Sequence, residues 1–254
     1  MILRRVIEHV KAQNWFAVAI DFVIVVTGVF IGIQVSNWNA ARGDRVKEAA
    51  YLTQLVDDMT ADLGQIDRVA NVASTRMAVI ALVLDQADLT PPPATFHFQD
   101  CAFEPCSGFL TIEPKAPFSS DHPAAANDAL SDLRRFNPVR HTYDALISTG
   151  DIGLLRNGVV RRNLQAYYAN AREVEKVEER FLSDFHDLRQ TRHEFGIGAG
   201  GASLDDLVEA AKTSPKFAAQ LRSHWVDSGF QIRSMNHARD LASDLISGVE
   251  AENQ

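Results

Sequence analysis

Residues 15–35 read WFAVAIDFVIVVTGVFIGIQV, and this stretch decides the organisation of the chain. It contains one ionisable side chain, Asp21. A bilayer core about 30 Å thick needs roughly 20 helical residues. Trp15 and Trp38 bracket the stretch, and indole rings favour the headgroup level of a membrane. The pattern predicts a single transmembrane helix over residues 15–38, in contact with the lipid bilayer and followed by a larger soluble domain.

Two alternatives to a membrane anchor fit this stretch less well. A cleavable signal peptide has an apolar region of about 7–15 residues and then a small-residue cleavage site. Here the apolar run is longer, and Asn-Trp-Asn follows it at 37–39. A core helix of a soluble protein is also disfavoured, because the run is apolar on every side. We therefore expect the anchor to be retained.

The orientation of the predicted anchor is not decided by the charges beside it, since both flanks carry the same number of basic residues. These are Arg4, Arg5 and Lys11 before it, and Arg42, Arg45 and Lys47 after it. Cys101 and Cys106 lie close together in a turn-rich segment, which suits a disulfide in an oxidising compartment; two free thiols are the alternative. With the short basic N-terminus, the pair favours a cytoplasmic flank (1–14) and a domain in the periplasm or outside the cell.

One face of the predicted membrane helix carries an acid and two glycines. Gly28 follows Asp21 by seven residues and Gly32 by eleven, so at 100° per residue all three lie on one side. An acid within a span costs a few kcal/mol and indicates function, and Gly-x-x-x-Gly allows close approach of two membrane helices. We expect this face to pack against another helix, in a homodimer or in another membrane protein. The alternative is an acid that pairs with the basic flank.

The same segment resembles a family of bacterial single-span membrane proteins of unknown function, in which the span begins with an acid and ends in Asn-Trp-Asn. The matching positions are Asp21, Val25, Gly28, Gln34, Trp38 and Asn39, then Tyr51, Leu52, Leu55, Asp58 and Asp62, and later residues 146–150, Leu154, Arg156, Asn157, Tyr167 and Tyr168. Departures are Asp21 and Gly32, where Glu and Ala are expected, and the cysteine-containing segment 93–118. The resemblance implies a bacterial inner-membrane location and the topology above, without any known activity.

The soluble part begins with a long amphipathic pattern, because residues 44–87 contain no proline and one glycine. Apolar residues recur three or four positions apart at Leu52, Leu55, Met59, Leu63, Ile66, Ala70, Ala73, Met77, Ile80 and Leu84. This seam predicts one long helix, which either runs straight on from the membrane helix or breaks from it, with Gly43 as the likeliest break. It could serve a homomeric coiled coil or a bundle within the chain; its Ala and Met content favours the bundle.

Later segments complete a predicted domain over residues 44–254. Three prolines at 91–93 end the first helix, and short strands are expected at 94–98 and 108–112, a hairpin insertion (93–118) with Cys101 and Cys106 between the strands. Helices are expected over 128–136, over 138–148 with Asn137 as its cap, from Asn157 to about 195, from Ser203, and from Pro215 onward. The fold class is mainly α, an N-terminal transmembrane helix plus an extracytoplasmic up-down bundle.

Charge and motifs limit the functions that this domain can have. Of 25 basic and 33 acidic residues, six and three precede Glu48, so the remaining 19 and 30 leave a net charge of −11. This excludes nucleic acid as an expected partner. The glycine run at 196–201 follows a helix rather than a strand, which argues against a nucleotide loop. His186 and His193 are about 10.5 Å apart along a helix, too far for one metal ion, and indicate a solvated face.

We therefore predict no catalytic residues, no metal and no cofactor, and a non-catalytic interaction or scaffold module on the membrane. An alternative rests on Arg156, Arg161 and Arg162, since cations near the start of a helix are unfavourable unless an anion or an acidic partner is present. That alternative is a sensor-like module which binds a small anion and acts through a membrane partner. Pairing of these arginines with acids of the bundle is the other reading.

Overall fold

The computed structural model describes residues 15–93, 95–99, 107–111, 117–198 and 200–252. It is mainly helical and divides into two compact units, Met1–Tyr51 and Leu52–Gln254. The boundary falls inside helix α2 (Trp15–Gln86). The basic flank at 1–14 and both cysteines, Cys101 and Cys106, lie outside the described residues.

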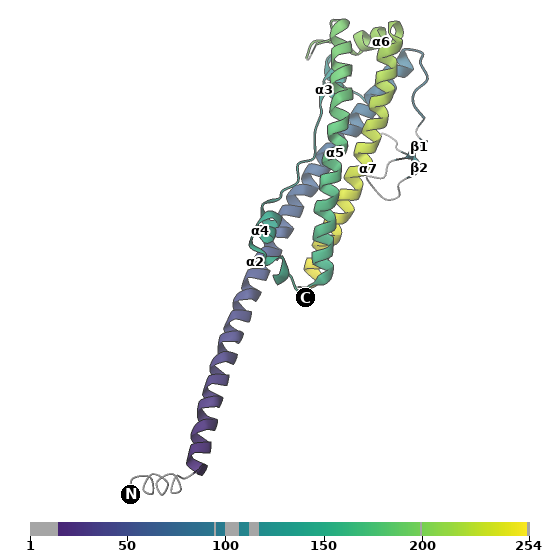
Figure 1. Ribbon diagram of the computed structural model, residues 1–254. Helices are drawn as coiled ribbons and strands as arrows, with labels where there is room; N and C mark the ends of the chain where they lie inside the picture. Colours follow the sequence, from purple (N-terminus) through teal and green to yellow (C-terminus); the bar gives the residue numbers. More distant parts are fainter. Residues whose placement is uncertain (1–14, 94, 100–106, 112–116, 199, 253–254) are drawn as a thin grey trace, which may run out of the picture. The chain divides into compact units, whose positions relative to one another are not determined.

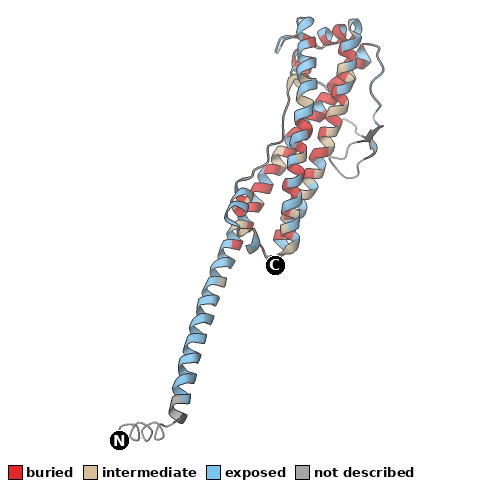
Figure 2. Cartoon of the chain, in the orientation of Figure 1, coloured by how far each residue is buried: buried red, intermediate tan, exposed pale blue. Residues whose placement is uncertain are grey.

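The first unit consists, in its described part, of the N-terminal half of α2. An 18-residue window of this helix has a mean hydropathy of 2.1 and no buried residue. Figure 2 shows this half of α2 as almost continuously exposed. It is therefore long and apolar enough to cross a membrane. Helix α2 continues through Gly43, so the first of the two expected arrangements, a single helix without a break, is confirmed; one glycine costs a helix only about 1 kcal/mol.

The second unit is built on three long helices (Figure 1). These are residues 52–86 of α2, then α5 (Gly158–Glu194) and α7 (Pro215–Glu252). Contacts fix their directions: Asp62 and Arg76 of α2 meet Tyr167 and Phe185 of α5, in the same order along both helices. Helices α2 and α5 are therefore parallel, and the expected up-down order is wrong for this pair. Helix α7 runs antiparallel to α2, because Arg76 meets Ser228 and Asp67 meets Arg239.

The predicted seam of α2 is confirmed as a buried face of this unit. Nine of its ten residues are buried, and Leu63 is half-buried. The upper core joins the end of the seam to residues of α6 (Leu204–Thr213) and α7, among them Leu207, Phe217 and Trp225. Burial of such a face is the main stabilising contribution to a bundle helix. The seam is covered within the chain, as the bundle interpretation expected.

Parallel α2 and α5 require the chain to return between them, and residues 117–140 make this return. The segment contains one short helix, α3 (Ala125–Ser131), and then runs without regular structure to α4 (His141–Thr149). The helices predicted at 128–136 and 138–148 are therefore wrong in their bounds. The physical reason is that the backbone N–H groups of Phe136 and Val139 donate to the carboxylates of Glu178 and Asp62, and so serve neighbouring helices instead of a helix of their own.

Helix ends in the second half of the chain follow the predicted signals. The side chain of Asn157 accepts hydrogen bonds from the N–H groups of Val159 and Val160 at the start of α5. Ser203 and Asp206 form a capping box on α6. Helix α4 ends at Gly150, whose φ of +77° favours glycine, and the 3₁₀ helix η1 (Asp151–Leu154) follows.

Two short strands form an antiparallel pair, β1 (Thr95–Gln99) and β2 (Ser107–Thr111). Thr95 pairs with Thr111 and Gln99 with Ser107. The hydroxyl groups of Thr95 and Thr111 lie 2.7 Å apart, and the rings of His97 and Phe109 make an edge contact. The residues that join the strands lie outside the described part of the chain.

A matched pair of substitutions tests the packing of α5. Val160 is fully buried and packs against Gly248 of α7, whereas its neighbour Val159 is 50% exposed. Val160→Ala should lower the free energy of unfolding by roughly 1–3 kcal/mol, because it removes buried methyl groups and leaves a cavity. Val159→Ala should change it by less than about 0.5 kcal/mol. Urea unfolding of the full-length chain in detergent, followed by circular dichroism, measures both; equal losses would contradict this packing.

Candidate functional site

The residues predicted to form a membrane packing face lie on the exposed half of α2. Asp21, Gly28 and Gly32 are all exposed, and a Cβ atom added at either glycine would meet no atom within 4 Å. The face is thus open in the described chain. Space for a close helix neighbour is the geometric requirement of a Gly-x-x-x-Gly contact.

The three arginines predicted as an anion site lie at the start of α5 and in the loop before it. Arg161 donates from Nη1 to the carbonyl oxygen of Leu155 at 3.3 Å, and Arg162 is exposed and lies against Gly158. Arg156 is exposed in the preceding loop and has a partner of its own. Each arginine thus has a neighbour within the chain, and the anion site at these residues stays a prediction.

A buried acidic cluster joins α2 to α4 and α5. Asp62 accepts hydrogen bonds from the Tyr167 hydroxyl at 2.6 Å, from the Val139 N–H at 2.9 Å and from the Gln65 amide at 3.1 Å. One turn earlier, Asp58 contacts Nε2 of His141 at 3.0 Å. Burial raises the pKa of Asp62 to about 6, although the hydrogen bonds from Tyr167 and Val139 lower it. Asp62 has no exposed surface, so the cluster holds elements together and presents no open binding site.

A second buried polar network crosses the middle of the bundle. The guanidinium of Arg76 donates to the Ser228 hydroxyl at 3.1 Å and to the carbonyl oxygen of Asp132 at 2.7 Å, and it lies over the Phe185 ring. Glu178 accepts from the Phe136 N–H and from the Gln231 amide, both at 3.1 Å. These bonds connect α2, α5, α7 and the return segment, and they satisfy polar groups that would otherwise be costly to bury.

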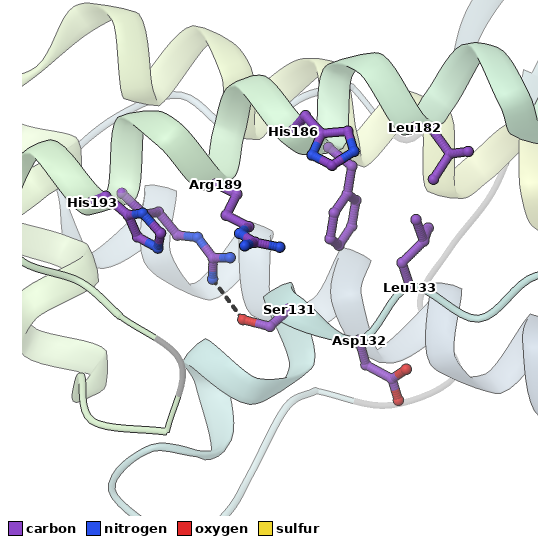
Figure 3. Close-up of a pocket in the computed structure, with 9 residues that line it drawn as sticks. Ser131, Asp132, Leu133, Leu182, His186, Arg189 and His193 are labelled. Carbon is purple, nitrogen blue, oxygen red and sulfur yellow. Dashed lines mark hydrogen bonds between the residues drawn. The ribbon is translucent and has the colours of Figure 1, made fainter.

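A cleft lies between the second half of α5 and the end of α3 (Figure 3). We call it the cationic cleft, and its volume is about 620 Å³. Helix α5 supplies four basic side chains and an apolar wall, while α3 and the residues after it supply the opposite side. Its lining is His186, Arg189, Arg192, His193, Leu182, Phe185, Ser131, Asp132 and Leu133.

The basic side chains of the cleft differ in how they are held. Arg192 is 5% exposed, and its Nη1 donates to Ser131 Oγ at 2.7 Å and to Asn127 Oδ1 at 2.8 Å. Arg189, His186 and His193 are exposed, and Figure 3 shows Arg189 between the two imidazoles. The only acid of the lining, Asp132, is paired with Arg134, and its carboxylate is directed away from Arg189.

Sequence reasoning assigned His186 and His193 to a solvated face and did not identify the cleft. Arg189 falls between them at spacings of three and four residues, so a basic strip was visible in the sequence. The spacing of these residues along α5 does not indicate where α3 lies. Only the packed return segment brings Asn127 and Ser131 onto Arg192 and turns one side of the strip into a cleft.

One comparison with known proteins gives a match. Residues 21–89 match the model of a family described as a family of unknown function, DUF6090. The match covers a little over a quarter of the chain and includes most of α2, with Asp58 and Asp62. It agrees with the resemblance to an uncharacterised family. No curated protein and no solved structure matches the chain.

The acidic cluster yields a pH-dependent prediction. The folded-state pKa of Asp62, about 6, lies above its ordinary value of 3.8, so folding takes up a proton in this range and the contribution of Asp62 to stability grows as the pH falls through 6. Tyr167→Phe removes a bond to the charged carboxylate. It should lower stability by about 1.5–3 kcal/mol above pH 7 and by less at pH 5, where Asp62 is protonated.

Tyr168→Phe is the control, because the Tyr168 hydroxyl donates to the neutral carbonyl oxygen of Val139 at 2.6 Å. Its effect on stability should be about the same at pH 5 and pH 8. Thermal unfolding of the two full-length variants in detergent, at both pH values, measures the difference. A Tyr167→Phe loss that does not depend on pH would count against the assigned role of Asp62.

Proposed function

We propose that the chain is a single-pass inner-membrane protein whose helical domain lies in the periplasm, and that it acts as a non-catalytic interaction module. The observation that carries this proposal is the exposed apolar half of α2. Phe22, Val25, Phe30 and Ile33 are each more than half exposed, in a window with no buried residue. An apolar surface of this extent in water would be a strong association or aggregation site. Contact with lipid removes the free-energy cost of exposing this surface to water.

The interaction part of the proposal rests on the open face of Asp21, Gly28 and Gly32. Lipid solvates apolar side chains well, so contacts between membrane helices depend on close packing and on polar groups. This face has both, with room at the glycines and a carboxyl group about two to three turns away. Its occupant is a second copy of the chain or the helix of another membrane protein.

Crosslinking in native membranes tests this face. In a chain with Cys101 and Cys106 changed to Ser, single cysteines at positions 28 and 32 should form a disulfide-linked homodimer upon mild oxidation where the occupant is a second copy. A photoreactive crosslinker attached to the same thiols should capture the helix of another membrane protein where that is the occupant. The reason is that the two glycines face the partner at short range. The product is read by non-reducing electrophoresis and mass spectrometry.

Cysteines in place of Val26 and Phe30 are the matched control, because these positions lie about 160° around the helix from the two glycines. They should crosslink at least about fivefold less. Equal crosslinking at all four positions would indicate random collision, and no crosslinking at 28 or 32 would remove the proposed contact face.

Reporter fusions at the C-terminus test the orientation. We expect an active alkaline phosphatase and a dark fluorescent protein, because the first folds only in an oxidising compartment and the second is inactive after export. The flanking charges are balanced, so this orientation rests on the cysteine pair. A bright fluorescent fusion with an inactive phosphatase would place the domain in the cytoplasm.

A further inference from the structure

We propose that the cationic cleft binds an organic oxyanion, a carboxylate or phosphate group carried on a small apolar body. Arg192 is buried in the wall of this cleft, with 5% of its surface exposed. Within the described part of the chain it forms no ion pair, and its hydrogen bonds go to the neutral groups Ser131 and Asn127. Its Nε has no hydrogen-bond partner among the residues that the structure describes. A buried guanidinium without a counter-charge is costly.

The surroundings of Arg192 increase this cost instead of relieving it. Arg189 lies one turn away along the same helix and carries a second positive charge; it has no hydrogen bond or ion pair with a described residue. Burial and the charge of Arg189 both lower the pKa of Arg192. An anion between the two guanidinium groups would compensate both charges, and a planar guanidinium matches carboxylate and phosphate oxygens in two-point contacts.

In another basic cleft of the chain, acidic side chains compensate the positive charge of two arginines. It has a volume of about 530 Å³ and includes Arg135, Arg140 and Arg172. Arg135 is paired with Glu178 at 3.6 Å and Arg140 with Asp144 at 3.8 Å, whereas Arg172 donates to the neutral carbonyl oxygen of Tyr168. The cationic cleft differs because neither of its arginines has an acidic partner among the described residues, and one of them, Arg192, is buried.

The size and the wall of the cleft indicate the rest of the ligand. A volume of about 620 Å³ exceeds the needs of a bare inorganic ion, and Leu133, Leu182 and Phe185 form an apolar side. Figure 3 shows Leu182 and Leu133 together at one end and Ser131, with its bond from Arg192, toward the other. The anionic group should lie at the arginines and the apolar body along the leucines. This site is separate from the membrane face, so either proposal can fail alone.

Calorimetric titration of the full-length chain in a neutral detergent tests the site, with phenyl phosphate and benzoate as probes. We expect saturable binding of at least one probe in the millimolar range or tighter, and none of benzylammonium, which keeps the ring and reverses the charge. Arg189→Gln should weaken binding roughly tenfold or more by removing a charged donor. Arg192→Gln should do the same; Arg189 is exposed, so its variant remains informative if the Arg192 variant fails to fold.

Arg68→Gln is the matched control, because it makes the same change at an exposed position of α2 outside the cleft. It should leave affinity unchanged. Short-chain phosphatidic acid in the same assay distinguishes a lipid headgroup from a soluble ligand, and the source whose anion binds tenfold tighter is the one selected. The proposal is overturned if neither probe binds the folded protein up to 10 mM, if benzylammonium binds equally well, or if Arg68→Gln weakens binding as much as Arg189→Gln.

Discussion

One helix, α2, has two surfaces that require different surroundings, and this constraint governs the rest of the structure. Its N-terminal half exposes apolar side chains all around, whereas residues 52–86 bury one seam and expose polar residues elsewhere. Apolar area removed from water contributes about 25 cal/mol per Å². The seam obtains this contribution from α5 and α7 of the same chain. The N-terminal half has no such cover in the described chain, and its composition suits lipid.

Within the bundle, buried polar groups decide how the helices are arranged. Apolar faces alone would allow several alignments, since hydrophobic contact has no direction. Arg76 and Asp62 of α2 each require partners at fixed positions, which are Ser228 and the backbone at Asp132 for one, and Tyr167 and Val139 for the other. Any sliding of α5 or α7 would leave these groups unsatisfied at a cost of about 1–3 kcal/mol each. Arg76 and Arg192 both donate to neutral groups, but the nearby acids Asp132 and Asp227 favour the charge of Arg76, whereas the charge of Arg189 opposes that of Arg192.

Local signals made much of this fold predictable. The seam of α2, the Asn157 cap, the capping box at Ser203 and the proline start of α7 depend on residues within a few positions of one another. The return segment was missed because its N–H groups bond to Glu178 and Asp62, which are 42 and 77 residues away. The cationic cleft was missed for a similar reason. Its cations were visible on α5, but the wall that encloses them comes from α3.

The central claim is that residues 15–38 of α2 lie in lipid while residues from 52 onward lie in water. Single cysteines at positions 24, 31 and 60, in a chain without Cys101 and Cys106, test this claim. They are labelled with a membrane-impermeant maleimide in membrane fragments whose bilayer is intact and whose two faces are both accessible to the reagent. Positions 24 and 31 should be protected until detergent and denaturant are added, and exposed position 60 should label at once. Rapid labelling at 24 and 31, equal to that at 60, would contradict the membrane account.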